Sequence, residues 1–134
     1  GKKNIVFKNT PKLKSLLAQA IVKKADGQVT SKAQNLINQA LIEDPFDPGQ
    51  ILNGLAQSQI GNEEEAFKIW VELYKITKST DTWRNDLEVN IRSAAKNLGI
   101  NNKSLEIEQM KLKNFRNNII ITFFGIVIIS LLVF

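Results

Sequence analysis

Five consecutive segments of the chain carry apolar residues three and four positions apart, and short breaker sequences separate them. This spacing places the apolar residues on one side of an α-helix. No segment alternates apolar and polar residues as a half-buried strand requires. The sequence therefore predicts an all-α fold, with helices from Pro11 to Asp26-Gly27, from Ser31 to Asp44-Pro45, from about Asp47-Pro48 to Gly61, from Glu63 to Thr77 and from about Thr82 to Leu98.

Capping residues support these boundaries. Thr30 or Ser31 can cap the second helix and Asn62 the fourth, because their side chains accept hydrogen bonds from the free amides of a first turn. Asp81 opens the fifth helix. The expected apolar stripes are Leu13, Leu16, Leu17, Ala20 and Ile21; Ala33, Leu36, Ile37, Ala40 and Leu41; Ile51, Leu52, Leu55 and Ala56; Ala66, Phe67, Ile69, Trp70, Leu73 and Tyr74; and Trp83, Leu87, Ile91, Ala94 and Ala95.

The second and fourth helices are related by a shift of 33 residues, which is close to the period of tetratricopeptide repeats. Gly54, Gly61 and Ala66 supply the small residues that let the two helices of one hairpin approach closely. We therefore expect a tetratricopeptide-like stack of antiparallel hairpins over residues 11–99, preceded by an irregular segment over residues 1–10. The corresponding positions are Ala33 and Ala66, Ile37 and Trp70, and Ala40 and Leu73.

The end of the chain has the composition of a membrane segment. Nearly every residue from Ile119 to Phe134 is apolar, although this run is slightly shorter than the ~20 residues that span a bilayer. We expect a polar and basic linker over residues 100–116 and the first part of a transmembrane helix over residues 117–134. The expected lipid-facing anchor residues are Ile119, Phe123, Ile126, Ile129 and Leu132.

Composition excludes most enzyme classes. The chain has no Cys and no His, which removes thiol nucleophiles, imidazole bases and the commonest transition-metal ligands. We expect neither an enzyme nor a bound cofactor. Glu63, Glu64 and Glu65 fit the positive end of a helix dipole better than a metal or acid-base site. The net charge of +5 is concentrated at the two ends of the chain, while residues 26–109 are acidic, so nucleic acid is not an expected partner.

In a stack of hairpins the first helix of each pair forms the concave face. Those positions predict an apolar peptide-binding groove formed by Ala18, Val22, Ile51, Leu55 and Ser58. The alternative is that Ile51 and Leu55 are core residues. Trp70 and Trp83 lie on apolar stripes and are expected to pack in the core rather than to recognise a ligand. The lysines near the start of the chain either contact anionic membrane lipid or form a solvated face.

The order of residues over about 13–99 resembles the C-terminal tetratricopeptide domain of the c-type cytochrome biogenesis family CcmI/CycH. This resemblance implies a periplasmic module of the bacterial inner membrane that binds the C-terminal helix of apocytochrome c and presents it to other membrane proteins of cytochrome c maturation. The likeness is carried by Leu17-Ala18-Gln19-Ala20-Ile21-Val22, Gly27-Gln28-Val29-Thr30, Ala40-Leu41-Ile42-Glu43-Asp44-Pro45, Gly54-Leu55-Ala56, Gln59-Ile60-Gly61, Ala66-Phe67-Lys68-Ile69-Trp70 and Thr82-Trp83 with Ile91.

The segment that begins at Met110 resembles a different family, the haem chaperone CcmE, at its N-terminal membrane start. The residues concerned are Met110-Lys111-Leu112-Lys113-Asn114-Phe115-Arg116. Their basic charge conflicts with the implied location, because positive flanks usually face the cytoplasm. The competing interpretation is a tail-anchored cytoplasmic tetratricopeptide adaptor that scaffolds proteins at a membrane.

Overall fold

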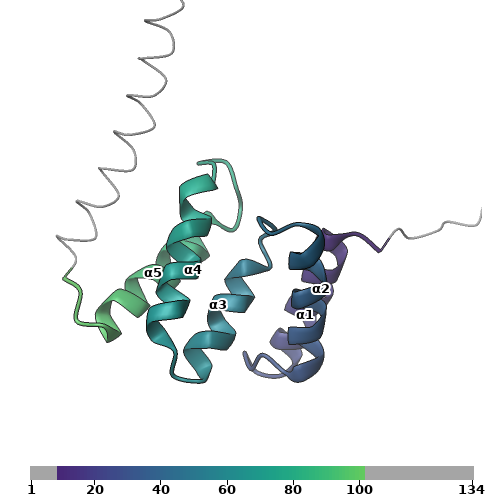
Figure 1. Ribbon diagram of the computed structural model, residues 1–134, viewed down its shortest axis with the longest axis horizontal. Coiled ribbons are helices and arrows are strands. Elements are labelled where there is room, and N and C mark those ends of the chain that lie inside the picture. The colour runs from purple at the N-terminus through teal and green to yellow at the C-terminus, as the bar shows by residue number, and fades with distance from the viewer. Residues whose placement is uncertain (1–8, 102–134) are drawn as a thin grey trace, which may run out of the picture. The chain divides into compact units, whose positions relative to one another are not determined.

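The computed structural model of the protein describes residues 9–101, which form five α-helices and contain no strand (Figure 1). The all-α prediction is confirmed for this part of the chain. Each predicted helix is present, and its ends lie within a few residues of those expected. The helices are α1 (Pro11–Lys24), α2 (Ser31–Glu43), α3 (Gln50–Gln59), α4 (Glu63–Ile76) and α5 (Arg84–Asn97).

One of the three predicted caps forms and two do not. The Thr30 hydroxyl accepts a hydrogen bond from the amide of Ala33, which starts α2 as expected. The side chain of Asn62 makes no capping bond and donates instead to Gln57 Oε1 at 3.1 Å. Asp81 accepts from the amide of Lys78, which forms a turn before α5 and delays the helix to Arg84.

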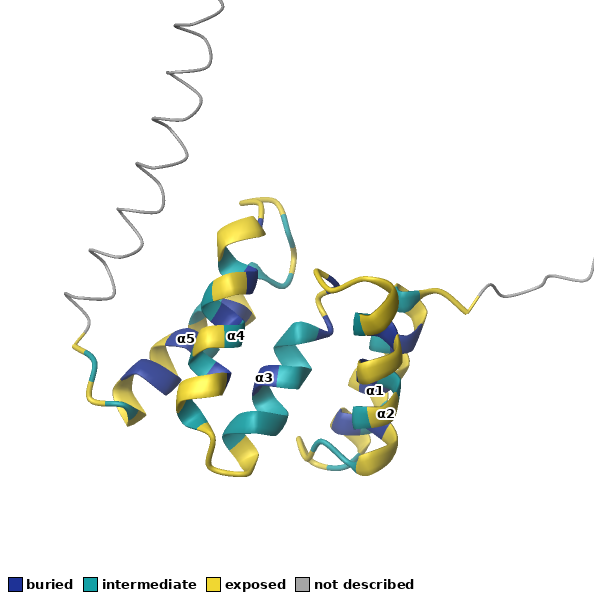
Figure 2. Cartoon of the chain, in the orientation of Figure 1, coloured by how far each residue is buried: buried dark blue, intermediate teal, exposed yellow. Residues whose placement is uncertain are grey.

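The first hairpin, α1 with α2, is held together by small and branched side chains on the faces that the two helices turn toward each other (Figure 2). Val29 in the connecting turn and Leu52 and Leu55 from α3 pack against this cluster. Lys14 is also buried, because its aliphatic stem packs in the hairpin while its ammonium group pairs with Glu43 on α2. The buried members of the cluster are Ala18, Val22, Ala33 and Ile37.

Of the stripe predicted for the first helix, only Ile21 packs against this core, and the other four residues lie on the exposed side of α1. Leu16 is 52 % exposed and Leu17 is 50 % exposed, and Leu13 is exposed as well. The physical reason is that α1 carries apolar residues on both sides, so that periodicity alone does not indicate which side packs against α2. The smaller side, with Ala18 and Val22, allows the closer approach and is the one that is buried.

The second hairpin, α3 with α4, is organised around Gly54 and Trp70. A Cβ atom at position 54 would overlap the indole ring of Trp70, so the close approach predicted at this glycine is confirmed. Trp70 is buried, as expected, and its indole N–H donates to the carbonyl of Ile51 at 3.0 Å. Trp83, the other tryptophan, is only half-buried.

A polar cluster joins α4 to α5. The hydroxyl of Tyr74 donates to Glu88 Oε1 at 2.9 Å, and the guanidinium of Arg84 lies 4.6 Å from the centre of the Tyr74 ring. At the other end of the pair, Asn97 donates to Glu63 at 2.9 Å. The apolar contacts between these helices come from Leu73 on α4 and from Leu87, Ile91, Ala94 and Ala95 on α5, all of which are buried.

The two hairpins are linked by polar bonds that reach across α3. Gln59, the last residue of α3, accepts from the amide of Val29 at 3.0 Å and donates to the carbonyl of Gly27 at 2.7 Å. At the opposite end of α3, the hydroxyl of Ser15 on α1 donates to the carboxylate of Asp47. The C-terminal end of α3 is therefore bound to the α1–α2 turn, and the connection that precedes α3 is bound to α1.

The predicted membrane anchor falls outside the described residues. Its residues Ile119, Phe123, Ile126, Ile129 and Leu132 are therefore not described. Most of the predicted linker over 100–116 and residues 1–8 also lie outside the described part of the chain. Within residues 9–101, none of the helices is both long and apolar enough to cross a bilayer.

Candidate peptide-binding site

Two of the five residues predicted to form the groove are core residues. Ala18 and Val22 lie at the centre of the first hairpin and are buried there. The structure therefore removes both side chains from the predicted ligand-binding surface. The reason is that α1 packs against α2 with its smaller residues, which buries Ala18 and Val22 and leaves its leucines exposed.

The other three predicted groove residues, all on α3, are half-buried and serve internal contacts. Leu55 packs against the first hairpin, together with Ala18 and Val22, as part of a core rather than an open groove. The carbonyl of Ile51 accepts the indole bond from Trp70. The Ser58 hydroxyl donates to Glu63 Oε2 at 2.7 Å. These five residues do not meet on one open surface.

An open hollow of about 340 Å³ lies elsewhere, between the α2–α3 connection and the outer side of α4. Its volume is at the lower end of the ~300–1,000 Å³ that ligand pockets span, which leaves room for a few side chains of a partner. Its lining residues are Pro45, Phe46, Gln50, Glu65, Lys68, Ile69, Glu72, Leu73, Lys75 and Ile76.

Exposed apolar side chains dominate this hollow. The Phe46 side chain is 67 % exposed, and that of Ile76 is 48 % exposed. Ile69 on α4 also lines the hollow and is half-buried, while the buried Leu73 connects the hollow to the core. Large exposed apolar residues that surround a hollow are typical of surfaces that bind another molecule.

The charges at the edge of the hollow balance each other. Lys68 Nζ lies 3.8 Å from Glu65 Oε2, and Lys75 Nζ lies 2.5 Å from Glu72 Oε1. Both pairs are three residues apart on α4, the spacing at which helix side chains meet. Such exposed pairs contribute little to stability, but they leave a rim without net charge.

The loop that carries Phe46 is held firmly in place. The carboxylate of Asp44 accepts from the amide of Phe46 at 3.0 Å, and Gln50 donates to the carbonyl of Pro45 at 3.1 Å. Asp47, only 3 % exposed, accepts from the amide of Gly49 at 2.7 Å and from the hydroxyl of Ser15. An ordered loop spares the entropy that a flexible one would lose on binding.

The described residues hold no group of three metal-ligating side chains. Every buried side-chain nitrogen or oxygen in the described part of the chain has a hydrogen-bond partner. The raised pKa of Tyr74 comes first from its partial burial and then from its bond to Glu88, and both belong to the α4–α5 contact. The hollow therefore presents an apolar surface with a polar edge to a partner.

Sequence reasoning did not identify Phe46 and Ile76 as candidate site residues. A signal for Phe46 exists, because an aromatic residue between Pro45 and Pro48 lies in a loop where a side chain has few neighbours to pack against. The sequence contains no such signal for Ile76, because it ends the apolar stripe of its helix and would be predicted to be a core residue.

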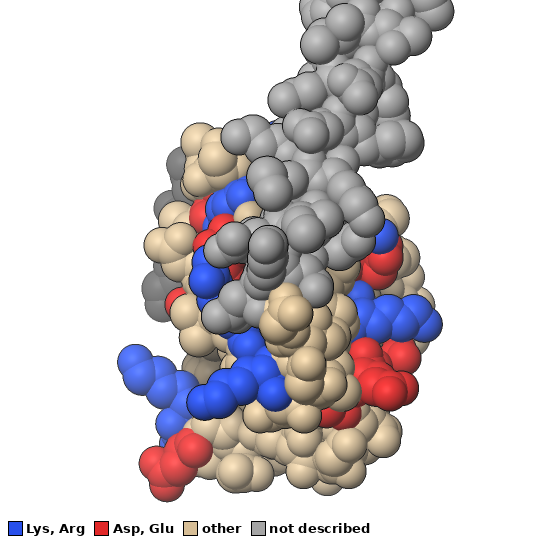
Figure 3. All heavy atoms as spheres, turned by 90° about the vertical axis from the view of Figure 1, so that its left-hand side faces the viewer, with Lys and Arg blue, Asp and Glu red and all other residues tan. Residues whose placement is uncertain are grey.

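Both signs of charge occur on the face of the described helices that Figure 3 shows, with Lys and Arg next to Asp and Glu at its two sides. Residues 9–101 carry eleven basic and eleven acidic side chains.

In comparisons with protein-family models, with curated proteins and with solved structures, the chain has no match.

Proposed function

We propose that this chain is a non-catalytic module that binds an amphipathic helix of another protein in the hollow between the α2–α3 connection and α4. The observation that carries the proposal is the exposure of Phe46 and Ile76 on opposite sides of that hollow. An apolar face of a helix fits such a surface by placing residues three and four positions apart into it. The balanced pairs at the rim then contact the polar flanks of the ligand.

The proposal includes a tetratricopeptide-like arrangement of the helices. Two features support it: each of the first two pairs, α1–α2 and α3–α4, packs as a hairpin, and Gly54 gives the second pair a close approach at Trp70. The 33-residue correspondence of Ala33 with Ala66 also supports it, because both alanines are fully buried in the second helix of their hairpin.

The proposed ligand is the C-terminal helix of apocytochrome c. This part rests on the sequence resemblance over about residues 13–99, in particular on Gly27-Gln28-Val29-Thr30 and on Thr82-Trp83. The module then holds the apocytochrome for haem ligation at the bacterial inner membrane, facing the periplasm, and acts beside other membrane proteins of cytochrome c maturation.

Peptide binding tests this function. The full chain is titrated against a fluorescent peptide of an apocytochrome c C-terminal helix, and Phe46→Asp is compared with Val89→Asp. Both wild-type side chains are exposed, at 67 % and 65 %, so neither substitution disturbs the core. Burying an aromatic side chain contributes about 1.5–3 kcal/mol, so Phe46→Asp should weaken binding by roughly tenfold to a hundredfold. Val89→Asp should leave the affinity unchanged.

Two results would overturn the proposal: an affinity that Phe46→Asp does not change, or a folded chain that binds no such peptide.

The basic flank of Lys111, Lys113 and Arg116 favours a second candidate, the tail-anchored cytoplasmic adaptor. Protease treatment of spheroplasts separates the two. A periplasmic module is cleaved in intact spheroplasts, whereas a cytoplasmic adaptor is cleaved only after the membrane is broken.

A further inference from the structure

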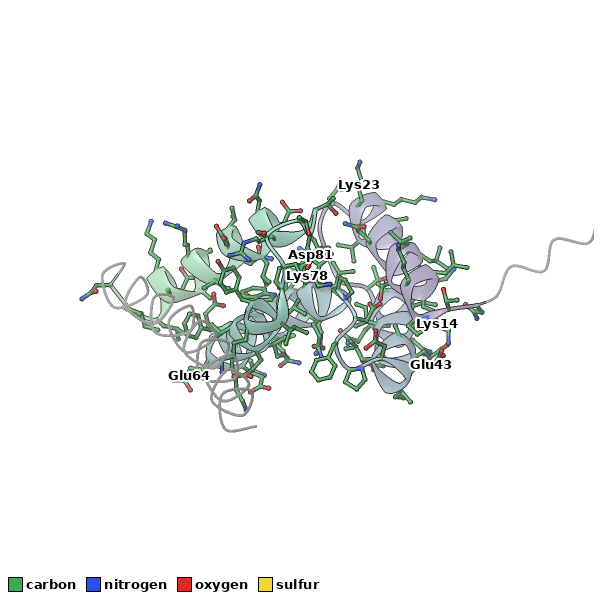
Figure 4. The ribbon with its side chains drawn as sticks, turned by 90° about the horizontal axis from the view of Figure 1, so that it is seen from above. Lys14, Lys23, Glu43, Glu64, Lys78 and Asp81 are labelled. Carbon is green, nitrogen blue, oxygen red and sulfur yellow. The ribbon has the colours of Figure 1, made fainter. Side chains whose placement is uncertain are left out.

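The side of α1 that faces away from the core is apolar. Leu13, Leu16, Leu17 and Ala20 follow the spacing of one helix face, and all four are exposed. The corresponding outer side of α2 is mostly polar, with Lys32, Asn35, Asn38 and Gln39 exposed, and its one large exposed apolar residue is Ile42. Among the described helices, the exposed leucines all lie on α1, which lies with α2 at one end of the described helices (Figures 1 and 4).

Lysines flank this leucine face. Lys12, Lys23 and Lys24 are exposed, and in Figure 4 Lys23 points away from the other helices. The fourth lysine of α1, Lys14, is paired with Glu43 and points into the hairpin. Neither α1 nor the ten residues before it contain an acidic residue. The outer side of α1 thus combines exposed leucine with an excess of positive charge, although the exposed Asp26 follows in the turn after the helix.

This combination distinguishes between two kinds of partner. The centres of protein interfaces are enriched in aromatic residues and arginine and depleted in lysine. Helices that lie on membrane surfaces carry large apolar residues on one side and lysines beside them, which contact lipid phosphates. Leucine with lysine, and no aromatic residue or arginine, matches the second kind.

We infer that the outer face of α1 lies on an anionic lipid bilayer, with Leu13, Leu16 and Leu17 at the acyl boundary and Lys12, Lys23 and Lys24 among the headgroup phosphates. This inference does not depend on the proposed peptide binding, because the hollow and the leucine face share no residue.

A fluorescent label at the leucine face tests the inference. The chain has no Cys, so Leu17→Cys provides one attachment site for the environment-sensitive fluorophore NBD. The full labelled chain is reconstituted into vesicles of equal parts phosphatidylglycerol and phosphatidylcholine, and into vesicles of phosphatidylcholine alone. Val89→Cys is the control, since Val89 is an exposed apolar residue on α5. Leu16→Cys repeats the measurement at a second position, so that a local disturbance at one label does not decide the result.

The expected result is a blue-shifted, stronger emission at positions 16 and 17 in the anionic vesicles only, with quenching by spin-labelled lipid. High salt, or the combined variant Lys12→Gln, Lys23→Gln and Lys24→Gln, should return the emission to the level seen in phosphatidylcholine. An aqueous emission in both kinds of vesicle would overturn the inference. A shift that is the same in phosphatidylcholine or detergent would also overturn it, because it would indicate contact with protein, such as a second copy. An equal shift at position 89 would overturn it as unspecific.

Discussion

At the scale of single residues, Gly54 and Trp70 determine how closely α3 and α4 pack. Glycine in the middle of a helix is usually destabilising relative to alanine by about 0.5–1 kcal/mol, because it has more conformational freedom in the unfolded chain. At position 54 the missing side chain is the condition for the contact, since a methyl group would overlap the indole of Trp70.

Gly54→Ala should therefore destabilise the protein by about 1–3 kcal/mol, against the helix propensity of alanine. Urea unfolding followed by circular dichroism measures the change. In a Trp70→Leu background, which removes the indole, the same substitution should be neutral or stabilising. A stabilising effect of Gly54→Ala in the wild-type chain would show that the helices do not approach as described.

Tyr74 is the only tyrosine of the chain, so its ionisation is read directly from absorbance at 295 nm. Partial burial, followed by the hydrogen bond to Glu88, raises its pKa above the ordinary 10.0, while Arg84 opposes the rise. We expect Glu88→Gln to lower the titration midpoint and Arg84→Gln to raise it. Shifts of the same sign in both variants would refute this assignment of the charges.

The raised pKa of Tyr74 also has a consequence for stability. The folded state binds the phenol proton more tightly than the unfolded chain does. The corresponding stabilisation is fully present below pH 10.0 and is lost as the pH rises through the folded-state pKa.

At the scale of helices and loops, the sequence predicts most of the fold and little of the site. The number, type and order of the helices follow from apolar periodicity and breakers, and Thr30, Gly54 and Trp70 behave as expected. Apolar periodicity does not predict which side of α1 is buried. The leucines on one side and the smaller residues on the other both follow the helical spacing of three and four positions. Phe46 and Ile76 come together only through the packing of the α2–α3 connection beside α4, which no local pattern encodes.

The α2–α3 connection is held in place by the hydrogen bonds of Asp47. Asp47→Ala should destabilise the protein by about 1–3 kcal/mol, because it leaves the part-buried hydroxyl of Ser15 and the buried amide of Gly49 without an acceptor. Asp44→Ala in the same loop removes one bond from an exposed side chain and should cost less. Thermal unfolding of the two variants checks the order, and an equal effect would mean that Asp47 does not anchor the loop.

At the scale of the whole molecule, two surfaces of different character serve two different partners in this account. The hollow has a rim of paired charges, whereas α1 carries three exposed lysines beside its leucine face and no acidic residue of its own. Salt screens exposed charges that attract a partner and has little effect on apolar contacts. Raising the salt concentration should therefore release α1 from anionic vesicles while peptide binding persists. Loss of both together, with the fold intact by circular dichroism, would contradict the separation of the two surfaces.

The central claim, that the hollow beside α4 receives a partner helix, is tested most directly by photo-crosslinking. The full chain carries p-benzoylphenylalanine in place of Phe46, or in place of Val89 as the control, and is irradiated with the apocytochrome c peptide. We expect a crosslink from position 46 and none from position 89. A peptide that binds but crosslinks only from position 89 would contradict it.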